Sequence, residues 1–431
     1  MSIVILGAGG AGLSAVKTIV ENAPEERLTV VYREDCLPYS PVVLPYYIEG
    51  TLSKEDMCLL SGRGMPAGVD LVQGREVCSI DTAGLKVKLD DGRAIGYEKL
   101  LICMGASPTL PALPGLEHGC CFVLRTLADA DRILAELPGR SGKVAILGAG
   151  PVGVELAVAL KKRGLGVSLI GRSRIMRRLF DPDFSEAIGD ILSKQGVEVL
   201  LGQHVEEVRA ARPRGAVVVT DQVRIACDML VVAWGVKPNL GFLQGSGIVT
   251  GESGGIAVDE HMRTSVERVY AAGDCVETKD YVTGERGINA IWPEAVAQGR
   301  IAALNMIGGD VGYSGGVSRN VVNIFGTPVF SAGSLRGEKK TAVTPFGRIR
   351  YTFVERRIVG VQIIGEPPRQ GILAPILKGA THPDWLLGVP RPTVESPPTV
   401  VSPANDASPA TGEGTLTSRR WSSSTSPLAG C

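Results

Sequence analysis

The chain has 431 residues, of which 44% are hydrophobic and 21% are charged, as in ordinary globular proteins with room for two or three domains. Its 45 basic residues balance its 45 acidic residues, so the overall charge favours neither nucleic acid nor an anionic membrane surface as a partner. The N-terminus has no basic segment before an apolar one, and no apolar run is long enough to span a bilayer. We therefore expect a cytoplasmic location and no integral membrane segment.

The nine cysteines are not spaced like metal ligands. The sequence contains no C-x-x-C pair and no cysteine–histidine group with zinc spacing. We therefore predict no metal site.

The first stretch of the chain predicts a strand, a glycine turn and a helix. Residues 3–6 are apolar, three glycines follow in G-x-G-x-x-G spacing, and residues 13–20 have a helical pattern. Glycine lets the backbone approach a pyrophosphate, and the N-terminus of the helix attracts the anion. We expect a dinucleotide here, although a glycine-rich turn without a ligand is the alternative. The residues expected to bind it are Gly7, Gly9, Gly10, Ala11 and Gly12.

Further candidates for the same cofactor follow along the chain. A carboxylate about twenty residues past the glycines is expected to bind ribose hydroxyls, and Glu34 is the first choice, with Asp35 in reserve. The alternative is a solvated charge on a loop. Residues 38–50 are rich in proline and tyrosine, are stiff and partly apolar, and would suit the wall of a flat ring system. Candidate residues from this segment and from the end of a later buried strand are Ser40, Pro41, Gly105 and Ala106.

The opening pattern recurs at residues 144–155, with the same apolar run and the same glycine spacing. This is an internal repeat of a whole βαβ unit and predicts a second dinucleotide site. Gly235 closes a later strand of this second half, as Gly105 closes one of the first. The candidate residues at the second turn are Gly148, Gly150, Pro151, Val152, Gly153 and Glu155.

The strand expected at residues 166–170 is followed by Gly171-Arg172-Ser173-Arg174, without an acid in the place that Glu34 has in the first unit. A carboxylate there favours NAD, whereas an arginine favours the 2′-phosphate of NADP. Arg172 and Arg174 therefore indicate NADPH. The alternative is that both are surface arginines and that NADH binds.

The last third of the chain contains two more candidate sites. A short strand at residues 269–271 leads to Gly273 and Asp274, whose carboxylate suits a polyol chain or, alternatively, caps the next segment. A helix with Pro293 in its first turn and Ala295 after it directs a positive dipole end at a negatively charged group. Residues 321–325, 329–333, 348–355 and 358–364 predict antiparallel strands, and residues 381–431 are expected to be disordered.

In this order the motifs resemble the pyridine nucleotide-disulfide oxidoreductase superfamily, over roughly residues 1–375. The resemblance implies an α/β fold with two Rossmann-like dinucleotide-binding domains, the NAD(P) domain being inserted in the FAD domain. It also implies a C-terminal α+β interface domain, which usually forms a homodimer, before the tail. The expected boundaries are 1–112 and 245–315 for the FAD domain, 113–244 for the NAD(P)H domain, 316–380 for the interface domain and 381–431 for the tail.

The resemblance also implies roles for individual residues. The first glycine turn would bind FAD, the second would bind NADPH or NADH, and Asp274 would contact the ribityl and pyrophosphate region. The helix after Trp292 would point at the pyrimidine edge of the flavin, and Glu155 would lie near the nicotinamide. Similar branches include NADH oxidases, coenzyme A-disulfide reductases, rubredoxin and ferredoxin reductases, the flavin portion of nitrite reductases, and flavin subunits of 2-oxoacid dehydrogenase complexes.

One departure from the family pattern bears on function. Many NADH oxidases and the coenzyme A-disulfide reductases carry a lone cysteine just before a Leu-Pro-Tyr, where this chain has Val42-Val43; Cys36 lies six residues too early to replace it. Without that sulfur, no disulfide relay or sulfenic acid can form beside the flavin. We expect hydride transfer from NAD(P)H to N5 of FAD, and then electron transfer to a redox partner protein or subunit of the ferredoxin or rubredoxin type. The alternatives are reduction of oxygen or a quinone, and a non-catalytic flavin-bearing redox sensor; no side chain is certain to be catalytic.

Overall fold

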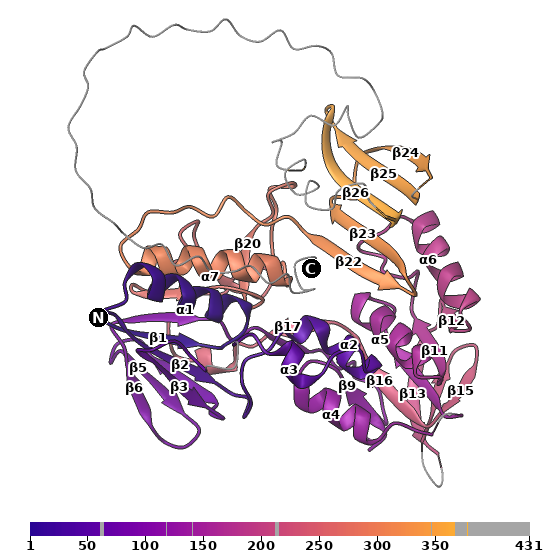
Figure 1. Cartoon of the computed structure of the whole chain (residues 1–431), viewed down its shortest axis with the longest axis horizontal. Helices are drawn as coiled ribbons and strands as arrows, with labels where there is room; N and C mark the ends of the chain where they lie inside the picture. The colour runs from indigo at the N-terminus through magenta and orange to yellow at the C-terminus, as the bar shows by residue number, and fades with distance from the viewer. Residues whose placement is uncertain are drawn as a thin grey trace, which may run out of the picture. The chain divides into compact units, whose positions relative to one another are not determined.

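The first sheet combines strands from two distant parts of the chain (Figure 1). The computed structural model describes residues 1–366 without 61–63, 118, 140, 212–214 and 346, together with Leu377. In sheet order the strands, all parallel to their neighbours, are β19 (Val269–Ala271), β7 (Lys99–Ile102), β1 (Ser2–Leu6), β2 (Arg27–Tyr32) and β3 (Val69–Gln73). Helices α1 (Gly10–Asn22) and α7 (Trp292–Met306) lie side by side. Gly299 permits their close approach, because a Cβ on it would collide with the backbone of Ala11.

A second parallel sheet is formed entirely by residues that lie between β7 and β19 in the sequence. Its strands, in sheet order, are β12 (Glu198–Leu201), β11 (Gly166–Gly171), β10 (Lys143–Leu147), β16 (Met229–Val232) and β9 (Cys121–Val123). The helices of this unit are α4 (Leu127–Ala135), α5 (Pro151–Lys162) and α6 (Pro182–Lys194). The predicted α/β class, with one Rossmann-like unit inserted in another, is confirmed; the residue boundaries given for the domains stay predictions.

Smaller elements connect and extend these two sheets. Two three-stranded antiparallel sheets are β4 (Val77–Asp81) with β5 (Lys86–Leu89) and β6 (Ala94–Gly96), and β14 (Ala216–Thr220) between β13 (Val205–Ala210) and β15 (Arg224–Cys227). The remaining strands are β8 (Ala106–Pro108), β17 (Val236–Pro238), β18 (Ile256–Ala257), β20 (Val276–Lys279) and β21 (Arg286–Gly287). The short helices are η1 (Pro41–Val43), α2 (Leu44–Glu49), α3 (Lys54–Met57) and η2 (Gly241–Leu243). Strands β4 and β5 form a hairpin, and Oδ1 of Asp81 accepts the N–H of Gly84 at 2.8 Å in the turn between them.

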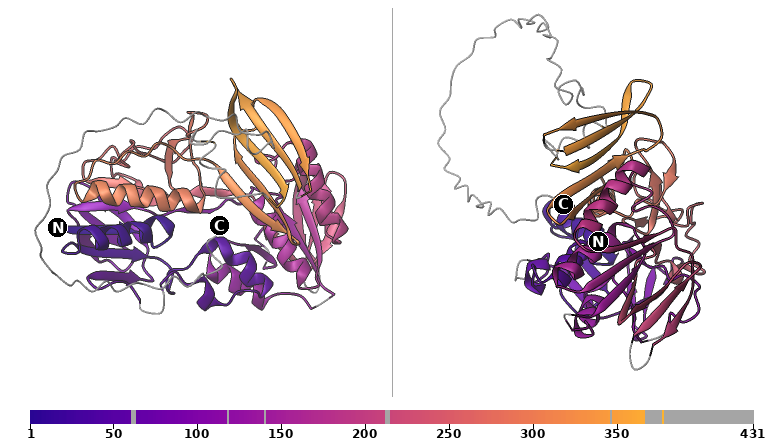
Figure 2. Two further views of the ribbon diagram at one scale, coloured as in Figure 1. Left: turned by 45° about the horizontal axis from the view of Figure 1, so that its top comes forward. Right: turned by 90° about the vertical axis from the view of Figure 1, so that its right-hand side faces the viewer.

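The C-terminal part of the described chain is an antiparallel sheet that packs beside α6 (Figure 2). In sheet order its strands are β22 (Arg319–Ile324), β23 (Thr327–Gly333), β26 (Arg357–Gly365), β25 (Gly347–Val354) and β24 (Glu338–Thr344). The sequence predicted all of these except β24. Residues 367–380 of the expected interface domain, apart from Leu377, and the tail expected at 381–431 lie outside the described residues.

The segment between β2 and β3 of the first unit packs with the inserted unit. Buried side chains of η1, α2 and α3 belong to the same hydrophobic cluster as α5 and β10. The residues of that segment in this cluster are Tyr39, Val43, Leu44, Ile48 and Met57. The segment therefore connects the first unit to the core of the inserted unit. Within the described residues, none of the helices combines the length and the apolar character needed to cross a membrane.

Candidate functional site

The first glycine turn is shaped by two glycines that cannot carry a side chain. Gly7 has φ +106°, and a Cβ on it would collide with the carbonyl oxygen of Cys103; a Cβ on Gly12 would collide with that of Gly7. Gly9, by contrast, has no atom within 4 Å of where its Cβ would be, and it precedes α1 without a side-chain cap. The turn therefore presents open space and free backbone N–H groups at a helix N-terminus, which fits a pyrophosphate.

A cavity of about 740 Å³ begins at this turn. Six of the predicted site residues line it: Gly7, Gly9, Glu34, Pro41, Gly105 and Ala106. Other parts of its wall come from residues 75–78, from Arg125 and Thr126, and from residues 237–242. The remaining predicted residues of the first unit lie outside the lining: Gly10, Ala11, Gly12, Asp35, Ser40, Gly273, Asp274, Pro293 and Ala295. The volume is within the range of cofactor sites.

Glu34 is held at the cavity wall by two tyrosines. The hydroxyl of Tyr39 donates to Glu34 at 2.7 Å and that of Tyr32 at 3.2 Å, while Tyr39 also accepts the N–H of Leu127 at 2.6 Å. Burial, together with the Glu34 carboxylate, raises the pKa of both phenols well above the usual value. Both tyrosines therefore stay neutral donors that orient the acid. The reserve candidate, Asp35, instead accepts from Gln73 at 3.4 Å.

Gly273 and Asp274 approach the first turn from the other side. A Cβ on Gly273 would lie 3.2 Å from the Cβ of Ala11 and 3.7 Å from that of Ala295, so these three predicted residues are brought together. Asp274 pairs with Arg125 at 3.1 Å. Because Arg125 lines the cavity, this ion pair connects Asp274 to it.

Arg125 and Gln298 were missed by the sequence analysis. Gln298 is buried, and its Oε1 accepts the N–H of Gly273 at 2.8 Å. A local signal for Arg125 was available, because it directly precedes Thr126, the N-cap of α4, which forms a capping box with Asp129. Gln298 stands three residues after Ala295 on α7, but nothing in the sequence pairs it with Gly273.

The start of α7 lies over the first turn. The indole carbons of Trp292 would be 3.2 Å from a Cβ on Gly10, so the ring packs closely against this glycine. Pro293 stands in the first turn of α7, whose N-terminus has no side-chain cap. The positive end of this helix therefore faces the same turn as the N-terminus of α1.

The second glycine turn repeats the geometry of the first. Gly148 has φ +125°, and its Cβ would collide with the carbonyl oxygen of Ala233; a Cβ on Gly153 would collide with that of Gly148. Gly150 has no atom within 4 Å of its Cβ position, and α5 starts at Pro151. The turn fits a second pyrophosphate for the same reasons. Two other predicted residues of this unit are Val152, which is exposed on α5, and Gly235, which has φ +108° after β16.

The loop between β11 and α6 carries the arginines that indicated NADPH. Arg172 is exposed directly after β11. The guanidinium of Arg174 donates to the carbonyls of Arg177 at 3.0 Å and Phe180 at 3.4 Å, so it braces the loop itself. Of the two arginines considered, Arg172 is the one available to a ligand.

Glu155 lies on α5, about one helical turn after Pro151, the first residue of the helix. Burial raises the pKa of its carboxyl to about 8. No hydrogen bond or ion pair reaches it within the described residues. Such a group is protonated at neutral pH and can donate or release a proton.

No thiol lies at the position where the family pattern places one. Val42 is exposed and Val43 is buried at the start of α2, next to Pro41 in the cavity wall. The buried Ser40 donates its backbone N–H to Met57 at 3.0 Å. Cys36 is half-buried, and burial followed by the charge of Glu34 raises the pKa of its thiol.

Two other cysteines, Cys78 and Cys103, do line the cavity. Cys78 stands in β4 beside residues 75–77, and Cys103 follows β7 at the first turn. Burial raises the pKa of Cys103 well above its usual value, so its thiol is not a ready nucleophile.

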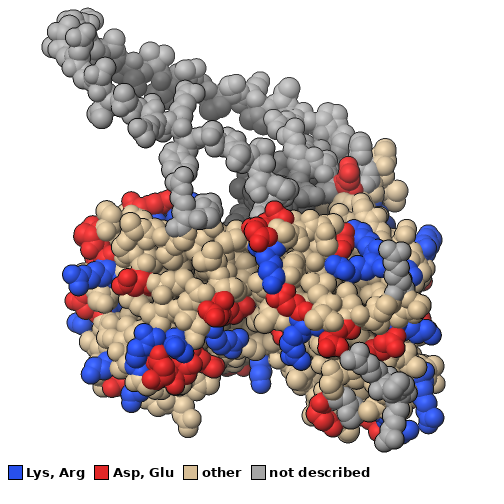
Figure 3. Space-filling model, turned by 60° about the horizontal axis from the view of Figure 1, so that its bottom comes forward, with Lys and Arg blue, Asp and Glu red and all other residues tan. Residues whose placement is uncertain are grey.

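On the face shown in Figure 3, acidic and basic side chains are interspersed, as expected from the balanced charge.

The sequence matches the family described as "Pyridine nucleotide-disulphide oxidoreductase" over residues 1–299. It is 30% identical over 395 residues to an NADH oxidase of Methanocaldococcus jannaschii, covering 85% of this chain and 88% of the relative. It is 33% identical over 341 residues to the epsilon subunit of NADH-dependent phenylglyoxylate dehydrogenase of Aromatoleum evansii, covering 77% and 78% of the two chains. The structure resembles an NAD-dependent persulfide reductase from A. fulgidus with a TM-score of 0.84, at 26% identity and with 91% and 80% of the two chains covered. The chain therefore belongs to the pyridine nucleotide-disulphide oxidoreductase family, and it is an NAD(P)H-dependent flavoprotein oxidoreductase that uses FAD, as its motifs predicted.

Proposed function

We propose that this enzyme transfers electrons between NAD(P)H and a separate redox protein or partner subunit, with FAD at the first glycine turn and the coenzyme at the second. Bound FAD would supply the redox chemistry, accepting hydride from the coenzyme and passing electrons on. The chain supplies binding and orientation: the turns hold the two pyrophosphates and Glu34 holds a ribose. Arg125, fixed by Asp274 at 3.1 Å, places a positive charge at the cavity.

One observation carries the choice of acceptor: valines stand where a redox cysteine would serve a small disulfide or persulfide substrate. Val42 and Val43 cannot form a mixed disulfide. The thiol of Cys58 donates to the carbonyl of Leu60 at 3.2 Å, and that of Cys36 has a raised pKa. Neither cysteine lines the cavity; Cys78 and Cys103 do, but Cys78 stands in β4 and burial raises the pKa of the Cys103 thiol. An acceptor that takes electrons directly from the flavin therefore suits this chain best.

Two relatives support a protein acceptor. The epsilon subunit of phenylglyoxylate dehydrogenase is one part of a larger enzyme, as its name states. The assimilatory nitrate reductase electron transfer subunit of Bacillus subtilis is 27% identical over 387 residues, although the match covers only 49% of that relative. The similarity to an NADH oxidase favours a second candidate, reduction of oxygen.

For the coenzyme we propose NADPH rather than NADH. Arg172 is exposed at the end of β11, where an acid would favour NADH. A second proposed contact is Glu155, whose neutral carboxyl would face the nicotinamide.

The homodimer and the cytoplasmic location stay predictions.

The test is an anaerobic reductive titration of the purified, FAD-loaded protein with NADPH and with dithionite. We expect complete bleaching of the flavin after about two electrons per FAD, because valines replace the cysteine that would act as a second two-electron centre. Uptake of about four electrons would reveal a redox-active sulfur and overturn the proposal. The variants Cys36→Ser, Cys58→Ser and Cys78→Ser serve as matched controls and should leave the count unchanged; Cys78 is included because it lines the cavity.

The acceptor is then tested with the NADPH-reduced protein. We expect fast reoxidation by an iron–sulfur protein of the ferredoxin or rubredoxin type and slow reoxidation by oxygen. Reoxidation by oxygen at least as fast as by either protein would favour the oxidase instead.

A further inference from the structure

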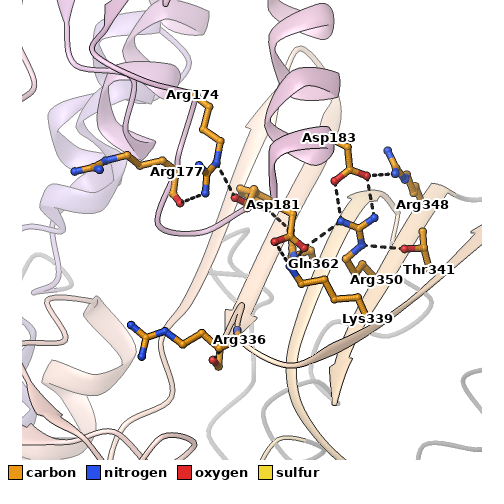
Figure 4. A network of polar contacts seen from close by, with 12 residues as sticks. Arg174, Arg177, Asp181, Asp183, Arg336, Lys339, Thr341, Arg348, Arg350 and Gln362 are labelled. Atoms are coloured by element: carbon orange, nitrogen blue, oxygen red, sulfur yellow. Dashed lines mark hydrogen bonds and ion pairs between the residues drawn. The ribbon is translucent and has the colours of Figure 1, made fainter. Parts of the chain in front are cut away.

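The N-terminus of α6 is held by side chains of the C-terminal sheet (Figure 4). Asp181, the N-cap residue of α6, accepts from Lys339 at 2.6 Å, from Gln362 at 2.9 Å and from Arg350 at 3.0 Å. Arg350 also forms a two-pronged pair with Asp183, at 2.7 and 2.8 Å. Two acids of the inserted unit are thus tied to strands β24, β25 and β26.

This network is more than a surface ion pair. The side chains of Asp181 and Arg350 are only 6% and 13% exposed, and the backbone N–H of Asp181 donates to Oε1 of Gln362 at 2.7 Å. Burial alone would raise the pKa of Asp181, but the hydrogen bonds from Lys339, Gln362 and Arg350 outweigh it and lower the pKa. The guanidinium of Arg350 also stacks on the ring of Phe184, 4.8 Å from its centroid. Shielded, fork-like pairs of this kind fix geometry as well as charge.

The same network forms one end of the arginine loop, residues 172–180 between β11 and α6. Asp181 directly follows Phe180, whose carbonyl accepts from Arg174. In the middle of the loop Met176 has φ +44°, and its N–H donates to Ala149 of the second glycine turn at 2.8 Å. The loop is therefore anchored at the glycine turn, within itself, and at the C-terminal sheet.

Three arginines of this loop remain free to meet a ligand. Arg172, Arg177 and Arg178 are exposed and have no ion pair within the described residues, and the loop contains no acid. Arginine recognises a phosphate through a fixed fork, so its backbone must be placed correctly. Whatever holds the loop in place also affects that recognition.

We infer that Asp181, Asp183 and Arg350 are positioning residues for the 2′-phosphate of the coenzyme, acting through the arginine loop. The inference rests on the proposed binding of the coenzyme at the second glycine turn. It gives the C-terminal sheet a role within its own chain, namely to set the discrimination between NADPH and NADH.

The experiment measures calorimetric binding of 2′,5′-ADP and of 5′-AMP to the FAD-loaded full chain, so it needs no turnover. In the wild-type protein 2′,5′-ADP should bind about tenfold tighter than 5′-AMP, because of the charge-assisted contacts to the extra phosphate. Arg350→Gln should remove most of this difference by weakening 2′,5′-ADP alone, and Arg350→Lys should restore part of it. Lys340→Gln is the matched control: Lys340 is adjacent to Lys339 in β24, is exposed, and pairs with Glu338 rather than with α6.

Equal weakening of both nucleotides would show a merely structural role and would overturn the inference, as would an unchanged ratio. If Arg350→Gln does not fold, Lys339→Gln tests the same point, because the side chain of Lys339 is 37% exposed. A wild-type ratio near one would also overturn the inference. It would leave the electron-transfer proposal standing, because that proposal is judged by flavin reduction and by the acceptor.

Discussion

The two glycine turns of this chain have the same steric requirements. The second strand of each unit, however, is followed by an opposite charge: Glu34 after β2 and Arg172 after β11. Gly7 and Gly148 both have a φ above +100°, and each lies against the carbonyl oxygen of the residue that follows the neighbouring strand of its sheet. Gly9 and Gly150 both face open space. The difference begins after the second strand of each unit.

In the first unit that strand leads to an acid held by two phenols, and in the second it leads to an exposed arginine. Glu34 accepts hydrogen bonds from Tyr32 and Tyr39, whereas Arg172 comes directly after the buried Gly171. An acid binds ribose hydroxyls and repels a phosphate, and an arginine does the reverse. On the proposed assignment, the turn fixes where a dinucleotide lies, while the end of the next strand decides which one it is.

The largest expected effect comes from filling the open space at each turn. Gly9→Val should weaken FAD binding about 100-fold or more, and Gly150→Val should weaken coenzyme binding by a similar factor, roughly 3 kcal/mol in each case. Each variant should spare the other ligand. Flavin absorbance and a coenzyme titration measure the two affinities.

The control for this pair is the stability of the cofactor-free protein. Because a Cβ at Gly9 or Gly150 meets no atom within 4 Å, the melting temperature of the apoprotein should change little. Loss of both ligands in one variant, or a large drop in melting temperature, would contradict the assignment of separate cradles.

A smaller effect is expected from reversing the charge at Arg172. Arg172→Glu should lower kcat/KM for NADPH about 10- to 100-fold, since a charge-assisted hydrogen bond contributes about 1.5–3 kcal/mol, and it should leave or improve kcat/KM for NADH. Lys194→Glu, at the exposed far end of α6, makes a comparable charge change as a control. An unaltered preference in Arg172→Glu would show that the second unit does not read the phosphate here.

Glu155 offers a test that depends on pH and has no counterpart in the first unit, where Ser14 occupies the same place after the glycines. Its pKa is about 8 in the folded chain against 4.5 in the reference state. The folded state therefore binds the proton more tightly, so this contribution to stability is complete below pH 4.5 and is lost as pH rises through 8. Between pH 6 and pH 8 the loss should be roughly 2 kcal/mol.

Glu155→Gln mimics the protonated acid and should remove this slope. We expect chemical denaturation of the coenzyme-free protein to show the variant gaining stability on the wild type as pH rises. If the stability of the two proteins depended on pH in the same way, the Glu155 carboxylate would be hydrated in the folded protein and its pKa would not be raised.

The features that the sequence predicted are those set by local pattern. Glycine spacing after an apolar strand identified both turns, and alternating apolar residues identified β22, β23, β25 and β26. Strand β24 escaped because its side chains, among them Lys339 and Lys340, are mostly exposed and show no apolar face. The strand forms because it pairs with β25, although its own sequence does not indicate a strand.

The features that the sequence did not predict depend on residues far apart in the chain. Arg125 meets Asp274 across 149 positions, and Arg350 meets Asp181 across 169. Nothing in the sequence pairs these residues, and only the fold brings them together. Arg174 shows the opposite case, because its spacing suggested a phosphate contact while the folded loop engages it with its own carbonyls.

The smallest expected effect probes the phenols that distinguish the first unit. Tyr39→Phe removes the donor that holds Glu34 at 2.7 Å and the acceptor that satisfies the N–H of Leu127 at 2.6 Å. We expect FAD affinity to fall about tenfold and stability to fall by about 1–2 kcal/mol, since two hydrogen bonds of roughly 0.5–1 kcal/mol each are lost. Tyr32→Phe should have a weaker effect, because its contact with Glu34 is longer, at 3.2 Å. Coenzyme affinity should not change in either variant, because no acid follows β11 in the second unit for a phenol to orient. An equal loss of affinity for both ligands would mean that Tyr39 acts through the shared hydrophobic core and not through Glu34.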